Sequence, residues 1–146
     1  MTKKWLPGML ALTMSKPAAT ACSIGALTGM AFGSYDVFSS EDTLGAGNIQ
    51  VTCDQPFSIS LSAGANSNNY RTRRMAGPNG SYLFYNLYSD VDHLSLWGDS
   101  TDPSQMVHGK GTGQAESFDV YGVIGHGQTA ASVGTYGDSI LVLVTF

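Results

Sequence analysis

The last seven residues of this 146-residue chain constrain its fold more than any other segment. Residues 140–146 read Ile-Leu-Val-Leu-Val-Thr-Phe, so a strand formed here carries apolar side chains on both faces. Such a strand is normally central in a sheet and covered on both sides. No later strand follows Phe146 to pair with it, and an exposed apolar sheet edge promotes aggregation. We therefore expect an earlier strand of the chain, or another molecule, to cover this edge.

Short apolar or alternating runs separated by turn residues make up most of the chain after residue 21. The clearest alternation is in residues 48–53, which place Ile49, Val51 and Cys53 on one face. Asn79-Gly80 is the strongest short turn signal. Strands at this spacing, with no helical period between them, predict an all-β fold and in particular a β-sandwich. The other strands are predicted over residues 30–35, 57–61, 82–88, 118–124 and 139–146.

Composition narrows the class of protein further. Glycine accounts for 18 residues, charged residues for 12% and apolar residues for 42%, which is typical of a turn-rich chain able to bury a core. The formal net charge of −4 disfavours nucleic-acid binding, because phosphate recognition needs a basic surface. No apolar run approaches the roughly 20 residues of a membrane-spanning helix, so we expect none.

Residues 1–21 have the features of a secretory signal peptide. Lys3 and Lys4 precede an apolar stretch over residues 5–14, and residues 19–21 read Ala-Thr-Ala, a typical cleavage site. Lys16 departs from this pattern, because it puts a charge between the apolar stretch and the cleavage site. A second interpretation is an N-terminal strand, because alternate apolar side chains share one face: Leu10, Leu12 and Met14.

Cys22 and Cys53 are the only two cysteines. In an exported protein, an even pair predicts a disulfide, here closing a 32-residue loop. A metal site or a catalytic thiol is the competing interpretation, but no histidine lies near either cysteine in the sequence.

A series of short segments resembles the spore coat protein U domain, over residues 22–146. No single segment is specific, but their order along the chain is. The segments are Phe-Gly-Ser-Tyr-Asp at 32–36, Gly-Asn-Ile-Gln-Val-Thr-Cys at 47–53, the alternating run 57–64, Arg-Met at 74–75, the aromatic run 82–90, Leu-Trp-Gly-Asp at 96–99, Val-Tyr-Gly-Val-Ile at 120–124 and Gly-Thr-Tyr-Gly-Asp at 134–138.

The resemblance implies an incomplete immunoglobulin-like β-sandwich that lacks its last strand. The same domain occurs in Csu-type subunits of archaic chaperone–usher pili. By resemblance, a periplasmic chaperone lends a strand to the gap, an outer-membrane usher exchanges it, and the N-terminal strand of a neighbouring subunit fills it. This is donor-strand complementation. The resemblance thus implies a structural, non-enzymatic subunit, exported through the periplasm to a surface pilus or coat.

Within this scheme the C-terminal run becomes one wall of the acceptor groove. We expect Ile140, Val142, Val144 and Phe146 to face the core, with Leu141 and Leu143 on the other face, although the opposite parity stays open. The Phe146 carboxylate is the expected anchor for basic chaperone residues. If cleavage follows Ala21, the chain accepts a strand but donates none, as in a terminal subunit or a coat protein. If Leu10, Leu12 and Met14 stay, they are the donor residues.

One basic cluster and one aromatic set offer an alternative function, an adhesive terminal subunit that binds a surface or glycan. Arg71, Arg73 and Arg74 would contact an anionic sugar or lipid, or else form ion pairs within an acidic chain. The aromatic residues favour the sandwich core over a carbohydrate site: Tyr82, Phe84, Tyr85, Tyr88 and Trp97.

No residue pattern predicts an enzyme, a metal site or a cofactor. Asp90, Asp92 and His93 lie close together, but such groups in a polar loop are mostly solvated. The glycines at 109, 111 and 113 around Lys110 lack the strand-to-helix context of a phosphate loop and predict a mobile loop.

Overall fold

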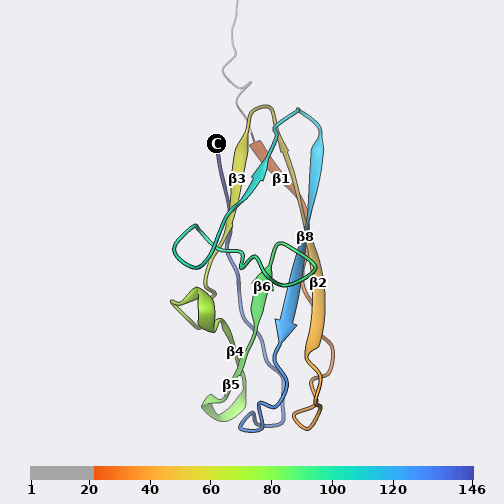
Figure 1. Cartoon of the computed structure of the whole chain (residues 1–146), viewed down its shortest axis with the longest axis vertical. Helices are drawn as coiled ribbons and strands as arrows, with labels where there is room; N and C mark the ends of the chain where they lie inside the picture. Colours follow the sequence, from red (N-terminus) through yellow and green to blue (C-terminus); the bar gives the residue numbers. More distant parts are fainter. Residues whose placement is uncertain (1–21) are drawn as a thin grey trace, which may run out of the picture.

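The computed structural model describes residues 22–146 of the chain. These residues form antiparallel strands arranged in three sheets (Figure 1). The strands are β1 (Cys22–Thr28), β2 (Thr43–Cys53), β3 (Phe57–Leu61), β4 (Arg74–Ala76), β5 (Tyr82–Phe84), β6 (Asn86–Tyr88), β7 (Val107–Gly109), β8 (Ala115–Ile124) and β9 (Val142–Thr145). Two short 3-10 turns, η2 (Tyr70–Thr72) and η3 (Pro78–Gly80), interrupt them. Within these residues no helix is long and apolar enough to span a bilayer.

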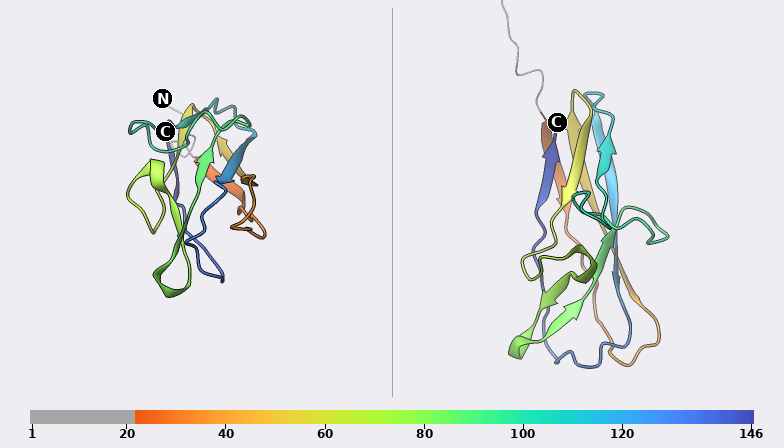
Figure 2. Two further views of the ribbon diagram at one scale, coloured as in Figure 1. Left: turned by 60° about the horizontal axis from the view of Figure 1, so that its bottom comes forward. Right: turned by 60° about the vertical axis from the view of Figure 1, so that its left-hand side comes forward.

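The strands form a four-stranded sheet with the order β1-β2-β8-β6, a three-stranded sheet with the order β7-β3-β9 and the β4–β5 hairpin. β1 and β9 are therefore edge strands of different sheets, and Figure 2 shows them side by side at the end of the molecule where the described chain begins and ends. β1 runs away from this end, whereas β9 runs toward it.

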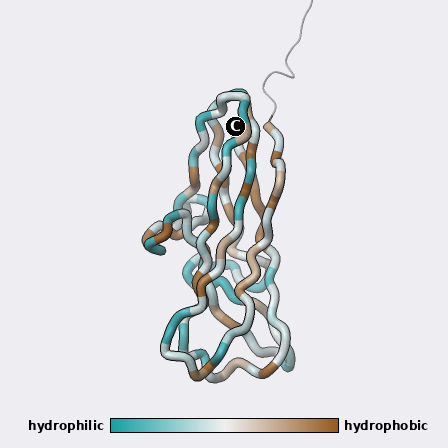
Figure 3. The backbone as a smooth tube through the Cα atoms, turned by 90° about the vertical axis from the view of Figure 1, so that its right-hand side faces the viewer, coloured by the Kyte–Doolittle hydropathy of each residue, from teal (hydrophilic) through white to brown (hydrophobic). Residues whose placement is uncertain are grey.

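The core lies between the sheets and follows the predicted alternation. Ile49, Val51 and Cys53 of β2 are buried, as are Phe57, Ile59 and Leu61 of β3, so both strand predictions are confirmed. Figure 3 shows hydrophobic and hydrophilic positions alternating along extended parts of the backbone. Trp97 is fully buried, and its indole Nε1 donates a hydrogen bond to the Ile59 carbonyl oxygen at 3.0 Å.

The single strand predicted over residues 82–88 is wrong, because the chain changes sheet at Tyr85. β5 pairs with β4, whereas β6 pairs with β8. At the break the Tyr85 amide donates to the Arg73 carbonyl at 3.0 Å. The buried side chains in this stretch are Leu83, Tyr85 and Leu87.

The aromatic residues accordingly divide between core and surface. Tyr85 and Trp97 are buried, as expected of core residues, whereas Tyr82 and Phe84 are 39% and 46% exposed. The turn signal at Asn79-Gly80 is confirmed, since both residues have positive φ (56° and 70°) in the link between β4 and β5.

The strand predicted over residues 30–35 is also wrong. This segment forms no ladder, and Gly33 (φ 77°) breaks its extended conformation. The strand that pairs with β2 on the edge opposite β8 is β1, which precedes residues 30–35 and whose apolar Ile24 and Leu27 are exposed. Hydrophobic periodicity did not predict β1, because its apolar side chains are exposed and do not form a buried face.

The C-terminal strand is shorter than predicted and is not central. β9 pairs only with β3, so within residues 22–146 its other edge has no partner strand. The earlier strand β3 thus covers one edge of β9. The apolar side chains on both faces of β9 therefore do not result from a central position between two strands.

A buried guanidinium organises the middle of the fold. Arg73 is fully buried, and its nitrogens donate to the Ser62 carbonyl (2.7 and 3.0 Å), the Trp97 carbonyl (2.7 Å) and Asn86 Oδ1 (3.0 Å). Burial lowers the pKa of Arg73, but a guanidinium keeps its proton in folded proteins. Arg73 therefore ties together the end of β3, the Trp97 segment and β6, and it cannot be the surface contact that its sequence position indicated.

We expect Arg73→Ala to lower the free energy of unfolding by about 3–5 kcal/mol, because it leaves buried acceptors unpaired and a cavity. Arg74→Ala is the matched control; as a partly exposed neighbour, it should cost less than about 1 kcal/mol. Urea denaturation of both variants measures the difference. Equal losses would contradict a structural role for Arg73.

Candidate binding cleft

An apolar cleft of about 890 Å³ opens between the β1 side and the β9 side of the sandwich. Its floor is made of core side chains, among them Leu61, Leu83 and Ile124. The cleft therefore reaches down to these three side chains of the core, which are themselves only 2–4% exposed. The full lining comprises residues 27–38, 47–49, 61, 75, 83, 85, 87, 120, 124, 131–138, 140 and 142.

Each of the two walls of this cleft contains a segment whose backbone is not paired with other backbone of the described residues. Residues 30–35 on one wall and 132–136 on the other form no backbone–backbone hydrogen bond within residues 22–146. Both segments lie beside or beyond an edge strand, β1 or β9. Since a backbone N–H or C=O removed from water needs a partner, this cleft presents donors and acceptors to anything that enters it.

Two glycines let one wall approach the inner face of the large sheet. Gly45 of β2 lies opposite Gly122 of β8. A Cβ on Gly122 would lie 2.1 Å from the Met30 sulfur and 2.7 Å from the Phe32 ring, and one on Gly45 would lie 2.8 Å from that ring. The missing side chains therefore make room for Met30 and Phe32, which pack against the core without joining a ladder.

The C-terminal residues divide between the two faces of β9. Ile140, Val142 and Val144 pack against the core, and Ile140 and Val142 also line the cleft. Leu141 and Leu143 are 67% and 54% exposed on the opposite face.

Phe146 is 59% exposed and does not pack with the core, contrary to the expectation for its side chain. The physical reason is position, because the ladder with β3 ends one residue earlier, at Thr145. A role of Ile140, Val142, Val144 or Phe146 in binding a partner stays a prediction.

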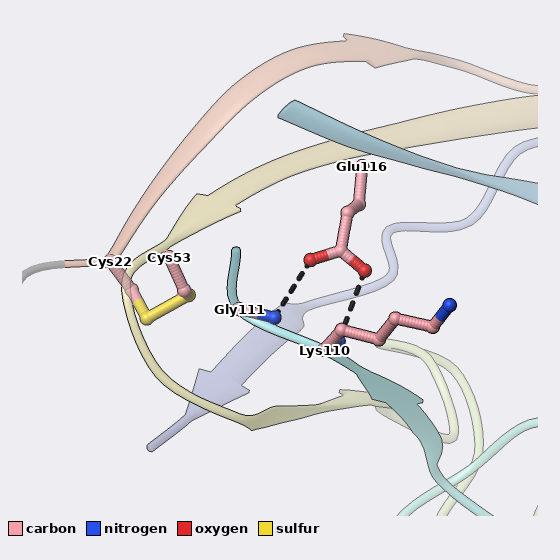
Figure 4. The surroundings of a disulfide bond; sticks show 5 residues. All are labelled: Cys22, Cys53, Lys110, Gly111 and Glu116. Carbon is pink, nitrogen blue, oxygen red and sulfur yellow. Dashed lines mark hydrogen bonds between the residues drawn. A yellow bond between two sulfur atoms is a disulfide. The ribbon is translucent and has the colours of Figure 1, made fainter. Parts of the chain in front are cut away.

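A disulfide fixes the β1 wall, as predicted. Cys22 and Cys53 face each other in the β1–β2 ladder, with their Cα atoms 4.2 Å apart, and are bonded (Figure 4). The bond ties the first residue of the edge strand to the last residue of the central strand β2.

Next to the disulfide, the Glu116 carboxylate accepts hydrogen bonds from the amides of Lys110 (3.0 Å) and Gly111 (2.9 Å), as Figure 4 shows. These bonds, that of Lys110 foremost, lower the pKa of Glu116. Gly109 in the same loop packs so closely on the Phe57 ring that a Cβ would lie 1.9 Å from it. The loop therefore binds a carboxylate of its own chain and packs on the core, contrary to the mobile loop expected.

One polar contact crosses the cleft lining. The Tyr85 hydroxyl donates to Asp138 Oδ2 at 2.6 Å, while Asp138 Oδ1 accepts from the Ala65 amide (3.0 Å) and Asn66 Nδ2 (2.9 Å). Burial first, and then this hydrogen bond, raises the pKa of Tyr85 well above its usual range. The neutral phenol thus fastens the wall around Asp138 to the β5–β6 junction.

The other two arginines lie at the surface. Arg71 forms an ion pair with Asp102 at 3.8 Å, and both side chains are largely exposed. Arg74 Nε donates to the Asn66 carbonyl at 2.7 Å, and its guanidinium lies 4.0 Å from the centre of the Tyr82 ring.

The histidine and aspartate groups are committed to local structure. Asp90 accepts from the amides of Ser95, foremost, and Leu94, which lower its pKa, and His126 contacts Asp42 at 2.6 Å. His93 packs edge-on against Tyr88. In the described part of the chain, no three His, Cys, Asp or Glu side chains are grouped as metal ligands.

The possible donor residues Leu10, Leu12 and Met14, and the predicted signal peptide 1–21, lie outside the described residues.

Comparison with known families decides the assignment. The model of the Spore Coat Protein U domain matches residues 9–143. The chain belongs to the spore coat protein U domain family. It is 32% identical to Protein U of Myxococcus xanthus over 142 residues, an alignment that covers 86% of this chain and 78% of that protein.

A solved structure shares the fold of this family member. It is the CsuC-CsuE chaperone-tip adhesion subunit pre-assembly complex from archaic chaperone-usher Csu pili of Acinetobacter baumannii. The TM-score is 0.59 at 20% identity, covering 92% of this chain and 41% of the matched chain. The present chain therefore spans less than half of that chain. The resemblance seen in the sequence and the all-β, immunoglobulin-like fold are confirmed.

Sequence reasoning missed the cleft wall opposite β1. Residues 131–138 were marked only by Gly-Thr-Tyr-Gly-Asp at 134–138, which contributed to the family resemblance but not to any predicted element. Asp138, which fixes this wall, has no local signal, because its partners Tyr85 and Ala65 are distant in the sequence.

Loss of the disulfide should destabilise the domain by about 3.7 kcal/mol, the chain-entropy value for a 32-residue loop. The double substitution Cys22→Ser with Cys53→Ser tests this by denaturant unfolding. Reducing agent should produce the same shift in the natural chain and none in the variant. An unchanged midpoint in the reduced natural chain would rule out a stabilising role.

The lowered pKa of Glu116 predicts a contribution to stability that depends on pH. Because folding lowers the pKa of Glu116, the ionised carboxylate stabilises the folded state at pH values above its ordinary pKa of about 4.3. This contribution disappears as the pH falls through the pKa of the folded state. Glu116→Gln should therefore reduce stability at pH 7 and have less effect near pH 2. The difference between natural and variant chains, measured by chemical denaturation at both pH values, is decisive. An equal effect at both would refute the charge-dependent role.

Proposed function

We propose that this chain is a non-enzymatic structural subunit of a surface pilus or coat, assembled by donor-strand complementation. One observation carries the proposal: an apolar cleft open to the core, flanked by two edge strands and by wall segments with unpaired backbone. An extended strand supplies what such a cleft lacks, namely main-chain hydrogen-bond partners and alternate apolar side chains.

The energetics favour a strand with apolar residues at every second position. About five inward side chains, each burying roughly 100 Å², would gain about 12 kcal/mol before the costs of ordering. Net affinity is smaller, because the strand and the walls lose conformational freedom. A polar strand would gain little of this energy and would leave the core open.

Family membership supports the identity of the partners. We infer that a periplasmic chaperone supplies a strand first, an outer-membrane usher exchanges it, and a neighbouring subunit then occupies the cleft. The shared fold with a subunit bound to its chaperone, CsuC-CsuE, is consistent with this order. The chain would thus pass through the periplasm to the cell surface, without a cofactor.

The segment containing Leu10, Leu12 and Met14 is the donor that we favour over a cleaved signal peptide. The family match begins at residue 9, so this segment falls within the matched domain. Its alternation matches the requirement of the cleft. Cleavage after Ala21 would make the chain an acceptor only.

An adhesive terminal subunit is the second candidate. It is favoured by a partly exposed arginine and two exposed aromatic side chains on the β4–β5 hairpin, outside the cleft.

A fused donor strand tests the assembly proposal. We expect a second copy of residues 9–19, joined after Phe146 by a flexible linker, to raise the melting temperature of the full chain by about 10 °C, because filling the cleft adds several kcal/mol. The same fusion with Asp at the donor positions 10, 12 and 14 should give no increase.

Neighbouring positions on β9 supply a matched pair of variants. Val142→Asp, in the cleft lining, should abolish the gain from the fused strand, whereas Leu143→Asp, on the opposite face, should preserve it. An equal effect of the two would contradict binding in the cleft. High-yield, stable monomer without any strand, and no gain from the fusion, would refute the proposal itself.

A further inference from the structure

We propose that the outer face of the β4–β5 hairpin is a binding site for a carboxylate-bearing polysaccharide. The inward side chains of this hairpin, Met75 and Leu83, line the cleft, so the outer face is a separate surface. Such a site goes beyond assembly, and both surfaces can be occupied together.

Strand register places one cation and two aromatic rings on this face. Arg74 lies directly opposite Phe84, and Tyr82 lies opposite Ala76, two residues along. Side chains at alternate positions share a face, and diagonal neighbours are within reach of long side chains. The Arg74 guanidinium accordingly lies over the Tyr82 ring, while Ala76 adds only a methyl group beside it.

The Arg74 guanidinium is held in place, and some of its N–H donors remain available for a ligand. Nε is fixed by the Asn66 carbonyl at 2.7 Å, and the Tyr82 ring supports the planar group from below at 4.0 Å. Within residues 22–146, the two terminal nitrogens of Arg74 donate no hydrogen bond, and its charge has no ion-pair partner. A fixed guanidinium with both terminal nitrogens available suits a carboxylate, which it can bind through two parallel hydrogen bonds.

The other arginines do not offer this arrangement. Arg73 is buried, and Arg71 already pairs with Asp102. In a chain with a net charge of −4, an anionic ligand is repelled by most of the surface and attracted at few places. Among the arginines of residues 22–146, Arg74 alone thus combines a fixed guanidinium with terminal nitrogens that are free to bind an anion.

The edges of the hairpin exclude a peptide that binds by strand addition. On β4, Ala76 exchanges two backbone hydrogen bonds with Gly137 (2.9 and 3.1 Å). On β5, the Gln128 side-chain amide binds both the N–H and the C=O of Phe84, each at 2.8 Å. A ligand must therefore bind to the face and not to an edge.

Two partly exposed aromatic side chains of β5 beside the cation favour a sugar. The rings of Tyr82 and Phe84 are 39% and 46% exposed. Flat aromatic surfaces stack on the C–H face of a pyranose, while the cation takes the carboxylate of the same or the next residue. An acidic peptide or an anionic lipid could use the charge but would not need both rings.

Polygalacturonate and its fully methyl-esterified form are the probes that test this site, because esterification removes the charge and keeps the sugar rings. Titration of the full chain, followed by isothermal calorimetry at low salt, should show binding of the acid form and at least about tenfold weaker binding of the ester, as expected for loss of a bidentate charge-assisted pair. Added salt should weaken binding of the acid form.

Arg74→Lys keeps the charge but loses the planar fork, and it should weaken binding of the acid form about tenfold. Tyr82→Ala should weaken it as well, whereas Arg71→Lys, the matched control, should not. Near-ultraviolet circular dichroism checks whether each variant is folded. If a variant is not folded, the comparison of acid and ester binding to the natural chain still tests the proposal.

Three outcomes would overturn the proposal: no binding of polygalacturonate, equal binding of acid and ester, or equal binding of polyglutamate, which would indicate attraction by charge alone. None of these depends on the cleft, so the assembly proposal can fail or hold independently.

Discussion

Unpaired backbone at two sheet edges is the constraint on which the rest of this structure depends. Within residues 22–146, β1 and β9 each have no partner strand on one side, and the segments 30–35 and 132–136 form no backbone–backbone hydrogen bond. A sandwich normally closes such edges by pairing them or by covering them. Here the edges flank an opening into the core, so an unmet hydrogen-bonding requirement and an unburied apolar surface coincide in one place.

The opening keeps its shape because its walls are fastened from outside. The Cys22–Cys53 disulfide holds β1, and Gly45 and Gly122 seat Met30 and Phe32 against the large sheet. The opposite wall is fixed through Asp138 by the Tyr85 hydroxyl. Without these ties, apolar walls in water would approach each other and bury the surface that a partner strand needs.

Hydrophobic periodicity predicted a strand correctly where one face of that strand is buried and the other is exposed to solvent. Ile49, Val51 and Cys53 follow this rule, as do Phe57, Ile59 and Leu61, and all were predicted from the sequence. It failed for Met30 and Phe32, which are apolar because they fill space above two glycines, and at Tyr85, where the chain changes sheet. It could not separate Arg73 from Arg74, since burial of a charge is decided by acceptors such as the Ser62 and Trp97 carbonyls, far away in the sequence.

The opposite directions of β1 and β9 give the cleft a polarity. Any strand lying between them is parallel to one and antiparallel to the other, and the two kinds of ladder differ in the spacing and slant of their hydrogen bonds. Reversing an inserted strand would exchange these neighbours and alter every main-chain contact. Two orientations are therefore chemically distinct states, and a chain of molecules linked through such clefts would have two unlike ends.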